Sequence, residues 1–219
     1  MTRPDDDSLW ALAHQERARL VDDLETLEPA DWARPTLCGT WDVEDVVAHL
    51  TAATTVTPGR WVRSIVAAGF RPAVHNQRRL REQRGPTPDQ TLDRFRAVVT
   101  STVAPSSHTA AYLGEVLVHA QDIRRPLGIA TEPAVEALTP VAEFYAANNF
   151  TVPSRTHADG LRLTADDGPF TAGTGPSVTG STLALVMTLA GRAVYLDELE
   201  GPGVPDLRRA VERSAARDA

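Results

Sequence analysis

Residues 114–122 read Gly-Glu-Val-Leu-Val-His-Ala-Gln-Asp, a pattern that predicts a helix with one polar stripe. Side chains four residues apart lie on the same face of an α-helix, so Glu115 and His119 are expected to be neighbours. Asp122 extends the stripe in one direction and Tyr112 in the other. Because Val, Leu and Ala surround these groups, the helix either buries polar side chains or binds something with them. A carboxylate and an imidazole one turn apart suit a divalent metal.

The N-terminal part of the chain is expected to form four amphipathic helices. Apolar residues recur there at intervals of three and four, which places them on one face of each helix. The expected helices cover residues 8–28, 42–57, 87–104 and 106–123, with N-caps at Ser8, Asp42, Thr87 and Ser106 or Ser107. Residues 60–70 are expected to add a helical piece, and the arginine-rich residues 71–85 a connector. Polar inner positions on two of the four helices predict a four-helix bundle with a metal site in its core.

The pattern changes after Gly128, where Pro, Gly and short alternating runs become frequent. The expected elements are helices over 135–149, 182–190 and 207–216 and short strands over 161–164 and 178–180. We therefore expect two domains, residues 1–130 and 131–219. The predicted fold class is α+β, with an N-terminal helical bundle and a small C-terminal α+β domain.

Composition excludes several classes of function. The chain has 219 residues, a net charge of −7 and no basic cluster, which argues against nucleic-acid binding. No run of roughly 18 apolar residues predicts a membrane span, and the acidic N-terminus is unlike a signal peptide. A lone cysteine, Cys38, cannot form an internal disulfide. We expect a cytoplasmic protein, monomeric or homodimeric, with small-molecule partners.

Familiar catalytic motifs are missing from the sequence. It has no phosphate-binding loop, dinucleotide-binding glycine motif, nucleophile elbow, His-Glu-x-x-His helix or paired cysteines. What remains is the Glu115–His119 pair and a separate histidine, His49, beside the apolar face of another helix. The spacing of Glu115 and His119 is compatible with either an ion pair or a metal site. His49 taken alone could be either a packed histidine or a metal ligand.

Two motifs resemble a known family. Residues 37–50 read LCGTWDVEDVVAHL, similar to the LCxGW and DVxAHL signature of mycothiol-dependent maleylpyruvate isomerase-like proteins, which belong to the DinB-like superfamily of metal-binding helical bundles. Gly39 and Thr40 stand where that family more often has Pro or Ser followed by Gly. Residues 114–128 are similar to a second family signature, and residues 161–204 resemble its small, sterol-carrier-like C-terminal domain. All 22 basic residues are arginine, which is typical of a GC-rich genome and fits the actinobacteria that make mycothiol.

The resemblance implies a metal-dependent enzyme that uses a thiol. It implies zinc, or another divalent metal, held by His49, Glu115 and His119, with mycothiol as the thiol cosubstrate. A zinc-activated thiolate would then catalyse the cis–trans isomerisation of maleylpyruvate, or an S-transfer, so the expected activity is that of an isomerase or of an S-transferase. A small carboxylate substrate needs a cation, for which Arg192 is the prediction, with Arg60 or Arg81 as alternatives.

Other interpretations stay open. The protein could be a non-catalytic carrier of a small ligand, or a zinc-dependent hydrolase of a thiol conjugate. Asp122 could orient a metal ligand or form a salt bridge with an arginine. Cys38 is expected to be a small buried residue in a turn.

Overall fold

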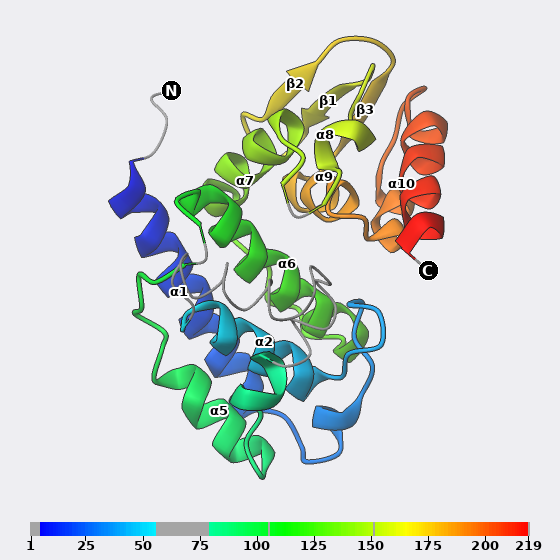
Figure 1. Cartoon of the computed structure of the whole chain (residues 1–219). Helices are drawn as coiled ribbons and strands as arrows, with labels where there is room; N and C mark the ends of the chain where they lie inside the picture. The colour runs from blue at the N-terminus through cyan, green and yellow to red at the C-terminus, as the bar shows by residue number, and fades with distance from the viewer. Residues whose placement is uncertain (1–4, 56–78, 105, 151, 219) are drawn as a thin grey trace. The chain divides into compact units, whose positions relative to one another are not determined.

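The computed structural model describes residues 5–55, 79–104, 106–150 and 152–218 (Figure 1). The chain divides into two compact units, Asp5–Glu132 and Pro133–Ala219. The first is helical in the residues described, and the second combines helices with a small sheet. The predicted α+β class, with a helical N-terminal part and a small α+β C-terminal part, is therefore confirmed. Residues 60–70 and most of the expected connector lie outside the described residues, although residues 79–83 are helical.

Four helices make up the described core of the N-terminal unit. They are α1 (Asp6–Glu25), α2 (Val43–Ala53), α5 (Pro88–Arg96) and α6 (Thr109–Leu127), with a short 3-10 helix η1 (Asp31–Ala33) after α1. Two of the predicted N-caps are confirmed, because the side chains of Asp42 and Thr87 accept from the backbone N–H groups of Asp45 and Gln90. These caps can be predicted from the sequence, because each joins two residues that are only three positions apart.

Several predicted helix ends are wrong. Ser8 is not the N-cap of α1, because the carboxylate of Asp5 accepts from the backbone N–H of Ser8 at 2.8 Å and starts the helix earlier. Helices α2 and α5 end sooner than expected, at Ala53 and Arg96. Neither serine caps α6, whose N-cap position is taken by His108 without a side-chain hydrogen bond. Ends without a strong cap are set by tertiary packing, which local sequence does not encode.

Helix α6 continues through Pro126, although the sequence predicted an end near Ile123. A proline has no N–H to donate to the carbonyl four residues earlier, which here belongs to Asp122. The backbone N–H of Leu37 donates to that carbonyl instead, at 3.1 Å. Helix α6 then ends at Gly128, whose φ of 71° lies in the left-handed region. The proline thus frees the carbonyl that ties the loop before α2 to α6.

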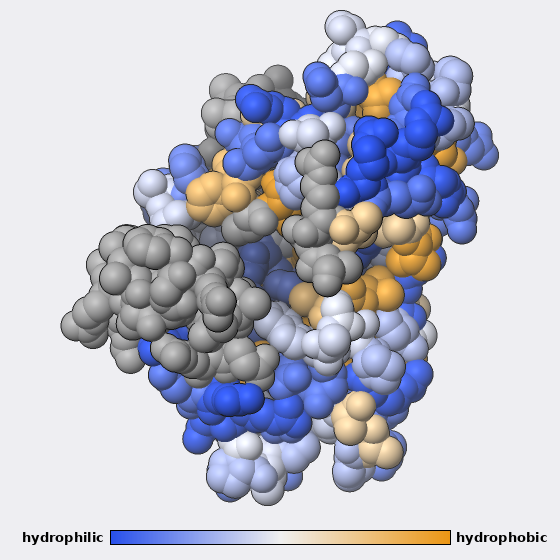
Figure 2. Space-filling model, turned by 45° about the vertical axis from the view of Figure 1, so that its right-hand side comes forward, coloured by the Kyte–Doolittle hydropathy of each residue, from blue (hydrophilic) through white to orange (hydrophobic). Residues whose placement is uncertain are grey.

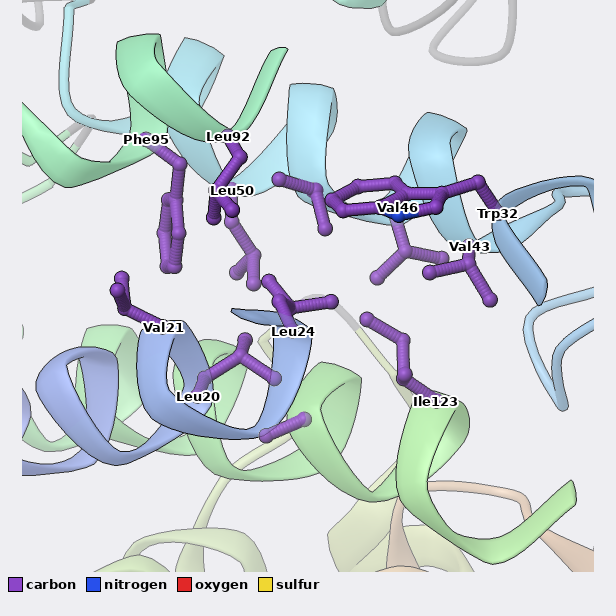
Figure 3. Close-up of a cluster of buried hydrophobic side chains, with 12 residues drawn as sticks. Leu20, Val21, Leu24, Trp32, Val43, Val46, Leu50, Leu92, Phe95 and Ile123 are labelled. Atoms are coloured by element: carbon purple, nitrogen blue, oxygen red, sulfur yellow. The ribbon is translucent and has the colours of Figure 1, made fainter. Parts of the chain in front are cut away.

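A cluster of buried apolar side chains joins the four helices (Figure 3). Leu20 and Leu24 of α1 face Val46 and Leu50 of α2, and Phe95 closes the cluster from α5 (Figure 3). Each of these side chains is at most 1 % exposed, so the bundle has a closely packed centre. This packing fixes α2 against α6, the two helices that carry the predicted ligands.

The C-terminal unit has a three-stranded sheet with the order β2–β1–β3. Its elements are α7 (Val135–Ala147), α8 (Ser154–His157), β1 (Arg162–Ala165), β2 (Thr171–Gly173), β3 (Ser177–Gly180), α9 (Thr182–Leu189), η2 (Ala193–Glu198) and α10 (Val204–Asp218). Strand β1 pairs antiparallel with β2 and parallel with β3. The sequence missed β2, α8 and η2, which are too short to show a periodic pattern.

Polar and charged residues cover much of the described surface that is visible in Figure 2. Within the described residues, no helix is long and apolar enough to cross a membrane. His157 is a buried polar residue of the C-terminal unit that joins three helices. The ring nitrogens of His157 contact the carbonyl of Leu189 at 3.0 Å and the hydroxyl of Ser214 at 2.9 Å, which joins α8, α9 and α10.

Candidate metal centre

Helices α2 and α6 bring three potential metal ligands together. His49 comes from α2, and Glu115 and His119 come from adjacent turns of α6. A carboxylate oxygen of Glu115 lies 2.7 Å from Nε2 of His49 and 3.5 Å from Nε2 of His119. The three ligand atoms all lie within 4.8 Å of one another. One carboxylate and two imidazoles facing a common point are a donor set that fits a divalent metal.

The electrostatics of the cluster favour a charged carboxylate. Burial alone raises the pKa of Glu115, but hydrogen bonds and positive charge from His119 and His49 hold it well below its usual range. Burial likewise lowers the pKa of His119, yet its contacts with Asp122, Cys38 and Glu115 raise it well above the usual range. Without a cation these interactions favour a charged Glu115 carboxylate and a protonated His119 ring, and a bound metal would replace a ring proton.

An indole ring forms one wall of the cluster. The ring of Trp41 lies 4.8 Å from that of His49 and 6.2 Å from that of His119, measured between centroids. The two imidazole rings are 5.0 Å apart and meet edge to face. Trp41 is held in the loop by hydrogen bonds to Thr36 and Cys38. The indole therefore limits how the two imidazoles can rotate.

A second group of donors meets the first at His119. Oδ2 of Asp122 lies 3.0 Å from Nδ1 of His119, so its carboxylate contacts the ring on the side away from Glu115. Of the two roles that the sequence left open for Asp122, this contact is the one that orients a ligand. The sulfur of Cys38 also lies within 4.8 Å of the ligand atoms of His119 and Asp122.

Cys38 is the functional-site neighbour that sequence reasoning missed. It was expected to be a small buried residue in a turn. It is half-buried and packs against the apolar cluster, and its sulfur lies within 4.8 Å of the ligand atoms of His119 and Asp122. The sequence pointed to this position only indirectly, because Cys38 belongs to the same family-like motif as His49. Its proximity to His119 depends on a contact between residues far apart in sequence.

The other predicted residues do not belong to the three-ligand cluster, or they lie outside the described residues. Tyr112 packs against Trp10 and the guanidinium of Arg17, each 5.2 Å from the centre of its ring. Arg192 lies in the C-terminal unit, where it donates to the carbonyl of Ala190 at 2.7 Å. Arg81 is exposed.

Arg60, the remaining alternative for the substrate cation, lies outside the described residues. The role assigned to Arg192 stays a prediction. The structure thus brings together the three predicted metal ligands, while the predicted carboxylate-binding arginine belongs to the other unit.

One comparison with known proteins concerns the N-terminal unit. Residues 13–105 match the family described as the mycothiol maleylpyruvate isomerase N-terminal domain. The predicted resemblance to mycothiol-dependent maleylpyruvate isomerase-like proteins is thereby confirmed. The matched segment includes His49 and ends before Glu115 and His119, so the second half of the cluster rests on the geometry alone.

Two solved structures share the fold over nearly the whole chain. One is the mycothiol-dependent maleylpyruvate isomerase, with a TM-score of 0.64, and the other is its histidine-to-alanine mutant, with 0.63. Each is 16 % identical, and each alignment covers 92 % of this chain and 96 % of the other. At this identity the likeness establishes the fold. No curated protein shows significant sequence similarity to the chain.

Proposed function

We propose that the protein is a metal-dependent enzyme that uses a low-molecular-weight thiol of the mycothiol type. The observation that carries this proposal is the convergence of His49, Glu115 and His119, whose ligand atoms lie within 4.8 Å of one another. His49 and Glu115 are separated by 66 positions, so a local ion pair does not explain their contact. The mycothiol maleylpyruvate isomerase domain over residues 13–105 supports the thiol.

Zinc is the metal that we propose, because one carboxylate and two imidazoles are typical of its sites. The same set also accepts nickel or other divalent ions. Three protein ligands leave a coordination position open, where zinc would lower the pKa of a bound thiol so that the thiolate exists near neutral pH.

The chain's own residues would prepare this site for its ligands. Asp122 holds the Nδ1 side of His119, which turns the Nε2 side toward Glu115. Trp41 keeps both imidazoles in place and covers them with an apolar ring. We assign Arg192 to the carboxylate of the substrate, because a guanidinium can bind both carboxylate oxygens at once.

For the reaction we propose a thiol-dependent cis–trans isomerisation of a maleylpyruvate-like carboxylate, or an S-transfer to a related substrate. The family of the N-terminal domain supports the first, and the fold shared with the mycothiol-dependent maleylpyruvate isomerase is compatible with it. The thiol would be regenerated in isomerisation and consumed in S-transfer. Product analysis therefore separates the two reactions.

The test is turnover of maleylpyruvate by zinc-loaded protein with and without mycothiol. We expect thiol-dependent formation of the trans isomer or of a thiol adduct. Arg192→Ala should raise KM more than it lowers kcat, and Arg192→Lys should recover part of the loss. Lack of turnover with any thiol would overturn the proposal. Binding of a small ligand that survives in His49→Ala would then favour a carrier.

Metal affinity should increase with pH. His119 holds its proton through Asp122, Cys38 and Glu115 against the effect of burial, which keeps its pKa well above the usual range. A metal must displace that proton, so below this pKa the apparent affinity should rise about tenfold per pH unit. Competition with a chromophoric chelator between about pH 6 and pH 8 would measure the slope. An affinity that does not change over this range would contradict the prediction.

A further inference from the structure

A cluster of donors that the proposed metal centre does not use lies beside the His119 ring. It consists of Cys38, His119 and Asp122, whose sulfur, ring nitrogen and carboxylate oxygen all lie within 4.8 Å of one another. We propose that these three residues form a second coordination site, selective for thiophilic cations such as Cd2+ or Cu+. The sulfur–nitrogen–oxygen donor set supports this selectivity, because a soft thiolate favours soft cations whereas the carboxylate–imidazole set of the first site does not.

The backbone holds Cys38 against α6. The N–H of Cys38 donates to the hydroxyl of Thr36 at 3.1 Å, and its carbonyl accepts from the N–H of Trp41 at 3.1 Å. The adjacent N–H of Leu37 donates to the carbonyl of Asp122, also at 3.1 Å. These hydrogen bonds thus hold the loop that carries the Cys38 thiol next to the turn of α6 that carries the Asp122 carboxylate. Coordination needs only small side-chain movements from this arrangement.

The two sites share one ligand, the ring of His119. His119 belongs to both donor groups, whereas His49 and Glu115 belong only to the first and Cys38 and Asp122 only to the second. A cation bound by Cys38 would engage the imidazole on which the first site depends. Its binding would release two protons to solvent, one from the thiol and one from the His119 ring, and involves no redox step. The expected consequence is inhibition by thiophilic cations that depends on Cys38.

Titration of the metal-free full-length protein with Cd2+ tests the proposal. Coordination by a thiolate produces an ultraviolet sulfur-to-metal charge-transfer band, which imidazole and carboxylate ligands do not give. We expect this band in the wild type and in His49→Ala, and we expect it to be lost in Cys38→Ser. Zinc binding through the first site should persist in Cys38→Ser, and the unfolding temperature should show that this variant is folded.

The outcomes separate this proposal from the proposed function. Absence of the band in the wild type would overturn the second site, as would Cd2+ binding that depends on His49 but not on Cys38. A band that persists in His49→Ala supports the second site even if the protein proves inactive with every thiol. Asp122→Asn provides a second variant, which should keep the band but require more Cd2+ to reach half of its intensity. An unchanged midpoint in that variant would exclude Asp122 as a ligand and overturn the three-residue site.

Discussion

Glu115→Ala should leave the purified protein with almost no bound divalent metal, while the wild type holds about one ion per chain when zinc is supplied. Glu115 contacts both imidazoles and provides the negative charge of the cluster. Its removal leaves two imidazoles, of which His119 also contacts Asp122. The affinity should therefore fall by more than the ~10–100-fold typical of substitutions that only support a ligand. Elemental analysis of the purified proteins measures the content.

The matched control is Glu132→Ala, which removes an exposed carboxylate from the same unit. It should retain the metal content of the wild type. Thiol-dependent turnover should follow metal content in all three proteins, since the open coordination position exists only with the metal bound. Full metal content in Glu115→Ala would exclude the three-residue site and the function built on it.

Arg124→Ala should cost about 3–5 kcal/mol of unfolding free energy, because it removes a buried charge from its partners. The guanidinium of Arg124 is fully buried, with Nε 2.7 Å from the carboxylate of Asp23 and Nη1 3.7 Å from that of Glu16. Glu16 is itself only 1 % exposed, and burial raises its pKa against the opposing effect of Arg124 and Arg19. Removing Arg124 leaves two carboxylates without this cation. Denaturant unfolding at neutral pH measures the loss.

The loss should shrink as pH falls. A carboxyl whose folded pKa is raised destabilises the protein when ionised, and protonation below that pKa relieves the cost. Glu16→Gln in the Arg124→Ala background should therefore recover part of the stability at neutral pH. Arg96 supplies the contrast, since it pairs with Glu25 at 2.6 Å on the surface, where solvent weakens the ion pair. If Arg124→Ala cost no more than Arg96→Ala, burial would not be the cause.

Local sequence predicted the features that depend on neighbouring residues. The caps at Asp42 and Thr87 follow from side chains that reach three residues along the chain. The pairing of Glu115 with His119 follows from the pitch of a helix, and the structure places their side chains 3.5 Å apart. The resemblance to a known family added His49 to this pair, which spacing alone had left as either a packed histidine or a ligand.

Helix ends were less predictable because packing decides them. Pro126 was expected to stop α6, yet the helix continues because Leu37 satisfies the carbonyl that the proline leaves without a donor. The partner comes from a loop almost ninety positions earlier, according to the residue numbers. No local pattern around Pro126 contains that information.

The sequence by itself determined the α+β class, the helical bundle and the types of ligand available. Tertiary structure alone decided which polar groups from different helices and loops meet. It placed His49 2.7 Å from Glu115, brought Cys38 beside His119, and buried Arg124 against Asp23. These contacts join residues from different helices and loops, so they depend on how the helices pack. Helical periodicity defines which face of a helix is polar, but only the packed bundle determines what that face meets.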